Sequence, residues 1–139
     1  DTAMDALITA ALAGIDVQVM VPDMPDHPFI FRATQYYANY LSRYGIKIYH
    51  YQNGFLHAKT LVIDDAIASV GSANFDIRSF KLNFEVNAFI YDAKIAQQLT
   101  AAFDEDVTHS QLLTPALIKE QGHWLRFKQY FSRLLSPIL

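Results

Sequence analysis

The side chains best suited to chemistry are concentrated between residues 57 and 74, which read HAKTLVIDDAIASVGSAN. The fixed positions of the spacing HxKxxxxDxxxxxxGSxN are occupied by His57, Lys59, Asp64, Gly71, Ser72 and Asn74. Six fixed positions in so short a window make this pattern more specific than most short motifs. Because it joins an imidazole, an ammonium and two neutral polar side chains, the pattern indicates a site for a phosphate group.

Each of these groups has a use in phosphoryl transfer. An imidazole can attack phosphorus or pass a proton, depending on its protonation state. The ammonium of Lys59 would neutralise phosphate oxygens and the charge that develops during transfer. Ser72 and Asn74 add hydrogen-bond donors, and the small residues between 71 and 74 would let a backbone approach a phosphate. Asp64 is less obviously close to phosphate, because it falls in an expected turn.

Short strands are expected to position these groups. Residues 58–63 and 66–70 predict an antiparallel hairpin with a tight turn at Asp64 and Asp65. Residues two apart in a strand share a face, so His57 and Lys59 should point the same way. A further strand is expected at 84–91, where Asn83, Glu85 and Asn87 alternate with apolar residues and would share one polar face.

This pattern resembles the HKD motif of the phospholipase D superfamily. The resemblance implies a two-step reaction that uses no metal ion and no cofactor. One motif histidine forms a phosphohistidine, and a second motif histidine protonates the leaving alcohol and then activates the acceptor. The sequence leaves open whether His57 is the nucleophile or the general acid.

The resemblance also assigns roles to individual residues. It implies that Lys59, Ser72 and Asn74 bind phosphate oxygens. Asp64 matches a position that is structural or charge-balancing, and Glu85 matches a carboxylate that hydrogen-bonds the motif histidine, as in a triad. The candidate catalytic residues are therefore His57, Lys59, Asp64 and Glu85, and the candidate phosphate-binding residues are Lys59, Ser72 and Asn74.

Two flanking runs narrow the resemblance. GSANFDIRSFKLNFEVN at 71–87 and SRLLSPIL at 132–139 are similar to the C-terminal half of bacterial cardiolipin synthases. This implies transfer of a phosphatidyl group between two phosphatidylglycerol molecules with release of glycerol, at the cytoplasmic face of a bacterial cell membrane. The alternatives are another phosphodiesterase of the superfamily, such as a phospholipase D or a homodimeric nuclease, or an inactive half that only binds phosphate or pairs.

The chain carries one such motif where the reaction needs two. The residues two positions after the other histidines are Phe, Gln, Gln and Leu, so none completes a second HxK. A complete site would require an N-terminal half with the other motif, or a homodimer mate. The chain begins at Asp1 in helical sequence, and we expect it to be a fragment of a longer protein.

Composition sets the remaining limits. The 139 residues suit one domain spanning 1–139, and 52% of them are apolar. The net charge of −3 gives no global attraction for nucleic acid, and without cysteine there are no disulfides or thiolate metal sites. No apolar run is long enough to span a bilayer, so the fragment itself is expected to be soluble.

The order of elements predicts an α/β fold with a mixed β-sheet and helices on both faces. A helix around 6–11 that ends at Gly14 precedes a strand at 15–21 and a loop at 22–28. A helix at 29–44, a strand at 46–51, the motif strands, a helix at 93–107 and two helical stretches after Pro115 follow. The helix–strand alternation at the start indicates parallel crossover units.

Several other residues are open to two interpretations. The remaining histidines, which we interpret as structural, are His27, His50, His109 and His123. Arg78 and Lys81 are as compatible with a solvated face as with contacts to phosphate or headgroup. Residues 122–139 predict an amphipathic helix whose stripe contains Trp124, Phe127, Phe131, Leu134 and Leu135. Packing of this stripe on the domain core or on the missing half is favoured, and a membrane interface is the alternative.

Overall fold

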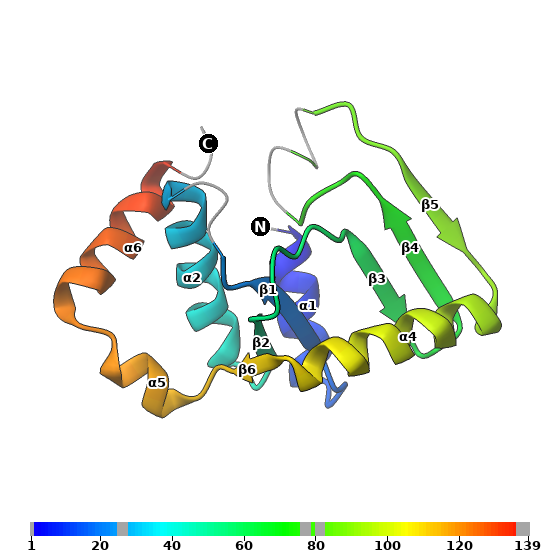
Figure 1. Cartoon of the computed structure of the whole chain (residues 1–139), viewed down its shortest axis with the longest axis horizontal. Helices are drawn as coiled ribbons and strands as arrows, with labels where there is room; N and C mark the ends of the chain where they lie inside the picture. Colours follow the sequence, from blue (N-terminus) through cyan, green and yellow to red (C-terminus); the bar gives the residue numbers. More distant parts are fainter. Residues whose placement is uncertain (1, 25–27, 76–78, 80–82, 136–139) are drawn as a thin grey trace. The chain divides into compact units, whose positions relative to one another are not determined.

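The computed structural model describes residues 2–24, 28–75, 79 and 83–135 (Figure 1). Its helices are α1 (Thr2–Leu12), α2 (Pro28–Ser42), α4 (Ala93–Thr108), α5 (Pro115–Glu120) and α6 (His123–Leu135). Its strands are β1 (Gln18–Pro22), β2 (Lys47–Tyr51), β3 (Thr60–Ile63), β4 (Ile67–Gly71), β5 (Asn87–Ile90) and β6 (Ser110–Leu112). The predicted α/β class is therefore confirmed.

The chain divides into two compact units. Unit 1 comprises Asp1–Leu56 and Ser110–Leu139, and unit 2 comprises His57–His109. The strands form two three-stranded sheets, β1-β2-β6 in unit 1 and β3-β4-β5 in unit 2. The sequence analysis expected one mixed sheet, and the structure has two. Apolar alternation identifies strands, but it does not identify the strands with which they pair.

Unit 1 contains the parallel crossover that the sequence predicts. β1 and β2 pair in parallel through the connecting helix α2, and β6 pairs antiparallel with β2. The core is formed by Ala38 and Leu41 of α2 with Ile46 and Ile48 at β2, and apolar residues of α1 and β1 pack against it. Gly45 follows α2 with a φ of +83°, a conformation that glycine adopts without steric penalty.

Unit 2 is an antiparallel sheet with α4 packed along it (Figure 1). β3 pairs with β4 and β4 with β5. The hairpin turn places both Asp64 and Asp65 at a φ of +51°, and the Ala66 amide donates to the Ile63 carbonyl at 3.1 Å. Two successive positive φ values match the right-handed twist of a tight hairpin, and Asp tolerates them better than most residues.

Three strands begin two or more residues later than the sequence predicts. β1 starts at Gln18 rather than Ile15, β3 at Thr60 rather than Ala58, and β5 at Asn87 rather than Phe84. Lys59 and Glu85 therefore lie just outside the regular strands. Before β3 and β5 begin, one backbone hydrogen bond joins Gly71 to Lys59 and another joins Ser72 to Val86. The candidate site therefore lies where regular strand pairing stops. Within the described part of the chain, no helix has the length and apolarity needed to cross a membrane.

Candidate active site

His57 and Lys59 contact each other directly. The Nζ atom of Lys59 lies 2.7 Å from Nε2 of His57. An ammonium has only donors, so Nε2 accepts this hydrogen bond through its lone pair. His57 is exposed and Lys59 is half-buried. The two side chains meet as their spacing predicts, although both precede the first residue of β3.

Ser72 and Glu85 form a second close pair. The Ser72 hydroxyl donates to Oε2 of Glu85 at 2.5 Å, and the Val86 amide donates to the Ser72 oxygen at 3.1 Å. The other carboxylate oxygen accepts from the Ser79 hydroxyl at 3.2 Å and from the Asn83 carboxamide at 3.3 Å. Both oxygens of the Glu85 carboxylate therefore have neutral donors.

These donors favour the ionised form of Glu85. The Ser72 hydroxyl makes the largest contribution to lowering the pKa of Glu85, and desolvation opposes it. Asn83, Ser79 and the positive charge of Lys59 lower this pKa further. Lys59 thus contacts the imidazole while its charge acts on the carboxylate. A direct hydrogen bond between Glu85 and His57 stays a prediction.

The segment that carries Ser72 and Asn74 is held by the strand beside it. The Ala73 amide donates to Oδ1 of Asn87 at 3.2 Å, and the Asn74 amide donates to the Ser79 hydroxyl at 3.1 Å. Ser79 is buried, and it also donates to Glu85. The sequence analysis missed Ser79, because it lies outside the motif spacing and no periodicity marks it.

Gly71 is required by chain packing. A Cβ atom at this position would lie 2.2 Å from the Val86 carbonyl oxygen and 2.3 Å from Oδ1 of Asn87. The Gly71 amide also donates to the Lys59 carbonyl at 3.2 Å. The glycine therefore allows the strand that carries Asn87 to approach closely, and its backbone joins the two halves of the motif. The expected approach of phosphate to this segment stays a prediction.

Asp64 lies apart from the other motif residues. It occupies the turn at the far end of β3, five residues from Lys59, which corresponds to roughly 16 Å of extended chain. Asp65, its neighbour in the turn, accepts a hydrogen bond from Thr100 of α4 at 2.5 Å. Asp64 is therefore a turn residue. The backbone of Lys59 lies beside Gly71, the residue before Ser72, and convergence of His57, Lys59 and Ser72 on one phosphate stays a prediction.

A cavity among the described residues of unit 1 contains none of the motif residues. Its volume is about 100 Å³, and it is lined by Tyr36, Asn39, Tyr40, Arg43, Ile118, Arg126, Gln129 and Tyr130. The motif instead occupies an exposed surface of unit 2. Of the other predicted contacts, His27, Arg78 and Lys81 lie outside the described residues.

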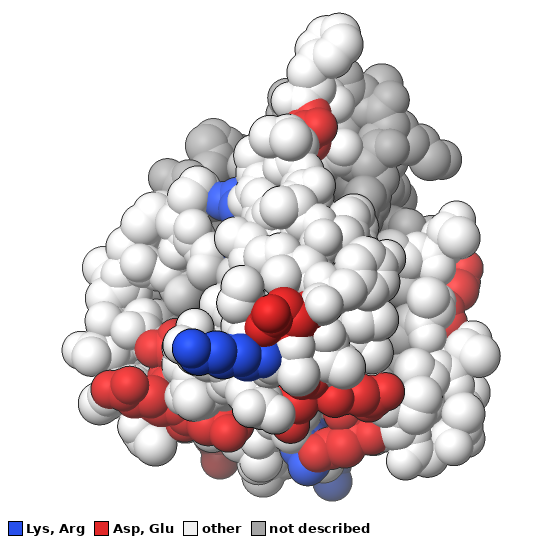
Figure 2. All heavy atoms as spheres, turned by 90° about the vertical axis from the view of Figure 1, so that its right-hand side faces the viewer, with Lys and Arg blue, Asp and Glu red and all other residues white. Residues whose placement is uncertain are grey.

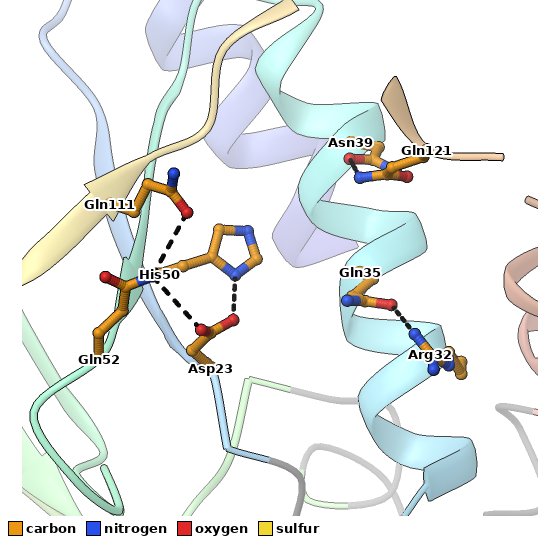
Figure 3. A network of polar contacts seen from close by, with 8 residues as sticks. All are labelled: Asp23, Arg32, Gln35, Asn39, His50, Gln52, Gln111 and Gln121. Atoms are coloured by element: carbon orange, nitrogen blue, oxygen red, sulfur yellow. Dashed lines mark hydrogen bonds and ion pairs between the residues drawn. The ribbon is translucent and has the colours of Figure 1, made fainter. Parts of the chain in front are cut away.

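His50 has different surroundings from His57. Its Nδ1 atom lies 3.7 Å from Oδ1 of Asp23, and Oδ2 of the same carboxylate accepts a weak hydrogen bond from Gln52 at 3.5 Å (Figure 3). Gln52 donates in turn to Gln111 on β6 at 3.3 Å. Burial lowers the pKa of His50, and the Asp23 carboxylate partly opposes that effect. These contacts join β1, β2 and β6, as expected for a structural histidine.

Charged side chains on one face of the molecule are mainly acidic. Figure 2 shows this face, on which Asp and Glu side chains gather along the lower part and few Lys or Arg side chains are visible. Proteins that bind nucleic acid usually present a basic patch or stripe to the phosphate backbone. The described side chains visible on this face form no such surface.

Comparison with known proteins gives one consistent result. Residues 1–107 match the family described as "Cardiolipin synthase, PLD-like domain". Cardiolipin synthases of Listeria welshimeri and Staphylococcus aureus are each 57% identical to this chain over 136 residues, or 98% of its length. The chain spans only 28% of the length of these relatives.

A solved structure supports the fold. The crystal structure of the phospholipase D family member Nuc from Salmonella typhimurium superimposes with a TM-score of 0.72. The match covers 79% of this chain and 72% of that one, at 23% sequence identity. At this identity, the likeness is evidence for a shared fold alone.

Proposed function

Since this chain belongs to the family of phospholipase-D-like domains of cardiolipin synthases, we propose that it supplies one half of a phosphatidyl-transfer active site. The observation that carries the proposal is the 2.7 Å contact between Lys59 Nζ and His57 Nε2. An imidazole lone pair and an ammonium are thereby held together on an exposed surface, next to a backbone segment that presents Ser72 and Asn74. A phosphodiester needs these groups in this proximity.

The proposed reaction joins two phosphatidylglycerol molecules. A histidine nitrogen attacks the phosphorus of the first, the bond from phosphorus to the glycerol oxygen breaks, and a second histidine gives the departing glycerol its proton. A hydroxyl of the second phosphatidylglycerol then attacks phosphorus and returns a proton to the second histidine. The phosphorus–nitrogen bond breaks, and cardiolipin is formed. His57 is one of these two histidines.

The polar contacts of the site would rearrange when phosphate binds. Lys59 now donates to the lone pair of His57, and the anionic oxygens of a phosphodiester would compete for the same ammonium. When the Lys59 ammonium donates to a phosphate oxygen instead, the lone pair on Nε2 of His57 is released for attack or proton transfer. Similarly, the single hydroxyl proton of Ser72 is donated to Glu85, so a Ser72–phosphate hydrogen bond requires this hydroxyl to turn. Asn74 is exposed, and its carboxamide would be a further donor to phosphate.

The second histidine must come from outside the motif segment. The chain spans 28% of the length of its curated relatives, so the remainder of a longer parent protein has room for the other motif. We propose that this remainder carries it, and that the parent acts at the cell membrane, where its lipid substrate resides. A homodimer that brings two copies of His57 together is the alternative source.

The test is lipid turnover by a full-length enzyme that contains this chain. Phosphatidylglycerol in mixed micelles should yield cardiolipin and glycerol in equal amounts, and DNA offered beside it should remain intact. The 139-residue chain alone should give no product above background at concentrations where it is monomeric. Turnover by the monomeric chain that does not depend on its concentration would contradict the need for a second histidine, and DNA cleavage without lipid turnover would favour a nuclease.

A further inference from the structure

Helix α6 buries polar residues and exposes apolar ones. Gln129 and Ser132 are only 3% and 2% exposed. By contrast, Trp124 is 68% exposed and Leu134 is 72% exposed. The exposed large side chains of the stripe are Trp124, Phe127, Phe131 and Leu134. The sequence analysis favoured packing of this stripe on the domain core or on a missing half, and the core alternative is wrong.

A polar network on α2 explains this orientation. Asn39, buried on α2, donates to Gln129 at 3.3 Å and to Gln121 at 3.0 Å, and Gln129 donates to Gln121 at 3.0 Å. Figure 3 shows Asn39 on α2 facing Gln121. Breaking these contacts would leave buried carboxamides without partners, which is more costly than leaving apolar side chains exposed. The network therefore fixes the polar side of α6 against α2.

The spacing of the exposed apolar residues along α6 places them in one stripe. Residues 124, 127, 131 and 134 follow the spacing i, i+3, i+7 and i+10, which keeps them on one side of an α-helix. The rings of Trp124 and Phe127 stack with centroids 5.6 Å apart. A contiguous apolar surface of this kind is typical of an interaction site.

Positive charge accompanies the stripe. Residues 121–139 include no Asp or Glu, whereas the whole chain has a net charge of −3. Arg126 donates to the Ile118 carbonyl at 2.9 Å and Arg133 lies over the Tyr36 ring of α2, so the cation beside the stripe is Lys128. The Nζ atom of Lys128 lies 5.4 Å from the Trp124 ring centroid, so a cation borders the apolar surface. Aromatic rings beside a lysine, in a segment without acidic residues, are characteristic of segments that lie at the interface of anionic bilayers.

We propose that the α6 stripe, defined as Trp124, Phe127, Phe131 and Leu134, inserts into the headgroup region of an anionic phospholipid bilayer. Lys128 contacts lipid phosphates beside it. This inference rests on the proposed function, because the substrate is then itself an anionic lipid of that surface. The charge of the segment selects this occupant over a second copy of the acidic chain.

The chain contains a single tryptophan, so the fluorescence of Trp124 reports on the stripe without labelling. Vesicles of phosphatidylglycerol should shift its emission to shorter wavelength, and phosphatidylglycerol brominated on its acyl chains should quench it. Vesicles of phosphatidylcholine should give a weaker response. Because the attraction is partly electrostatic, added salt should reduce binding to the anionic vesicles.

A matched pair of leucines separates the stripe from exposed apolar surface in general. Leu134 on α6 and Leu12 on α1 are 72% and 70% exposed. Leu134→Ser should lower the fraction of chain that sediments with phosphatidylglycerol vesicles several-fold, and Leu12→Ser should leave it unchanged. Lys128→Gln should weaken binding to the anionic vesicles and not to phosphatidylcholine. Circular dichroism of each variant checks that the fold is kept.

Three results would overturn the inference. The first is an unchanged emission of Trp124 with all vesicles. The second is an emission shift without lipid that grows with protein concentration, which would identify a second copy as the partner. The third is a shift only when the remainder of the parent enzyme is present, which would make the stripe an internal interface.

Failure of the docking surface can be distinguished from failure of the proposed function. His57→Ala should bind vesicles like the unmodified chain, and the full-length enzyme with this change should lose turnover. If vesicle binding is absent while the enzyme still converts monomeric short-chain phosphatidylglycerol, the docking inference fails and the function stands. If the chain binds vesicles but the full-length enzyme shows no turnover, the proposed function fails and the docking inference stands.

Discussion

His50 and His57 are seven residues apart in sequence and differ in every contact described for them. His50 lies on β2 in unit 1, its side chain is 13% exposed, and it faces the Asp23 carboxylate. His57 precedes β3 in unit 2, is exposed, and contacts the Lys59 ammonium. One imidazole is enclosed among neutral and acidic groups, and the other is presented to solvent beside a cation.

We interpret this difference as that between a structural histidine and the histidine that we propose to be reactive. Burial stabilises a neutral imidazole and removes it from large substrates, which suits a contact that joins strands. A lipid phosphate can reach only an exposed group, and the ammonium next to His57 supplies the positive charge that its transfer requires. His57 also lies outside the regular ladder, where side chains are not committed to packing between strands.

Replacement of His57 should give the largest loss of turnover among these predictions. In the full-length enzyme, His57→Ala should lower turnover of phosphatidylglycerol by about 10³-fold or more, as the loss of a covalent or acid–base catalyst does. Because His57 is exposed, the free energy of unfolding of the chain should change by less than about 0.5 kcal/mol. Turnover and urea unfolding are the measurements.

The control is His50→Gln, which should show the opposite pattern. Turnover should stay within a few-fold, and the free energy of unfolding should fall, because a buried side chain has been changed. Retention of more than a tenth of the activity by His57→Ala would remove the distinction between the two histidines.

Glu85→Gln tests whether charge or shape matters at the carboxylate. The amide keeps the size of the side chain and can still accept from Ser72, but it stabilises a neighbouring cation poorly. Turnover should fall by about 10- to 100-fold, with little loss of stability. Glu105→Gln on α4 is the matched control, because Glu105 is an exposed carboxylate in the same unit, and it should leave turnover unchanged.

The low pKa of Glu85 adds a pH dependence. Its folded-state pKa is below the ordinary value, chiefly because Ser72 donates to the carboxylate. The stabilising effect of the ionised Glu85 carboxylate is therefore complete above the ordinary pKa and is lost as pH falls through the lowered pKa. Turnover that depends on this carboxylate should fall over the same range, which gives the pH–rate profile an acid limb. Ser72→Ala should move this acid limb of the pH–rate profile to higher pH. An unmoved limb would show that another group governs it.

Gly71→Ala should disturb unit 2 through packing. The added Cβ would overlap the Val86 carbonyl oxygen and the Asn87 side chain, and relieving this overlap should cost about 1–3 kcal/mol of stability. Turnover should also fall, because the same shift moves Ser72. Gly122→Ala is the control, since nothing lies within 4 Å of a Cβ there, and urea unfolding compares the two. Equal free energies of unfolding for Gly71→Ala and Gly122→Ala would contradict the close approach of β4 and β5 at Gly71.

Local pattern and motif spacing predicted much of this molecule. The helix at 29–44 and the strand at 46–51 are observed as α2 and β2 within two residues at each end, because glycine and a clear apolar period mark them. The motif identified His57 and Lys59, whose contact depends mainly on sequence spacing. These features are set by neighbouring residues, so they can be inferred without knowledge of the tertiary fold.

Features set by distant contacts were not predictable. The three-residue strand β6 has no periodicity of its own and exists because it pairs with β2. Likewise, β3 and β5 begin later than their apolar patterns suggest, since ladder partners decide where a strand begins. The polar side of α6 faces α2 because Asn39 and Gln121 satisfy Gln129, a condition that involves residues 82 and 90 positions apart.

The pH dependence of unfolding is the finest test of the contrast between the histidines. Burial lowers the pKa of His50, so the unfolded chain binds more protons than the folded chain between that pKa and the ordinary value of about 6.5. Stability should therefore fall as pH drops from about 6.5 through the lowered pKa, and His50→Gln should remove this small loss. Asp23→Asn should steepen it, because burial then acts without an opposing carboxylate. Urea unfolding between pH 5 and 8 measures all three chains. Superimposable curves for the unmodified chain and His50→Gln would mean that His50 is not held neutral by burial, and exposure would no longer separate it from His57.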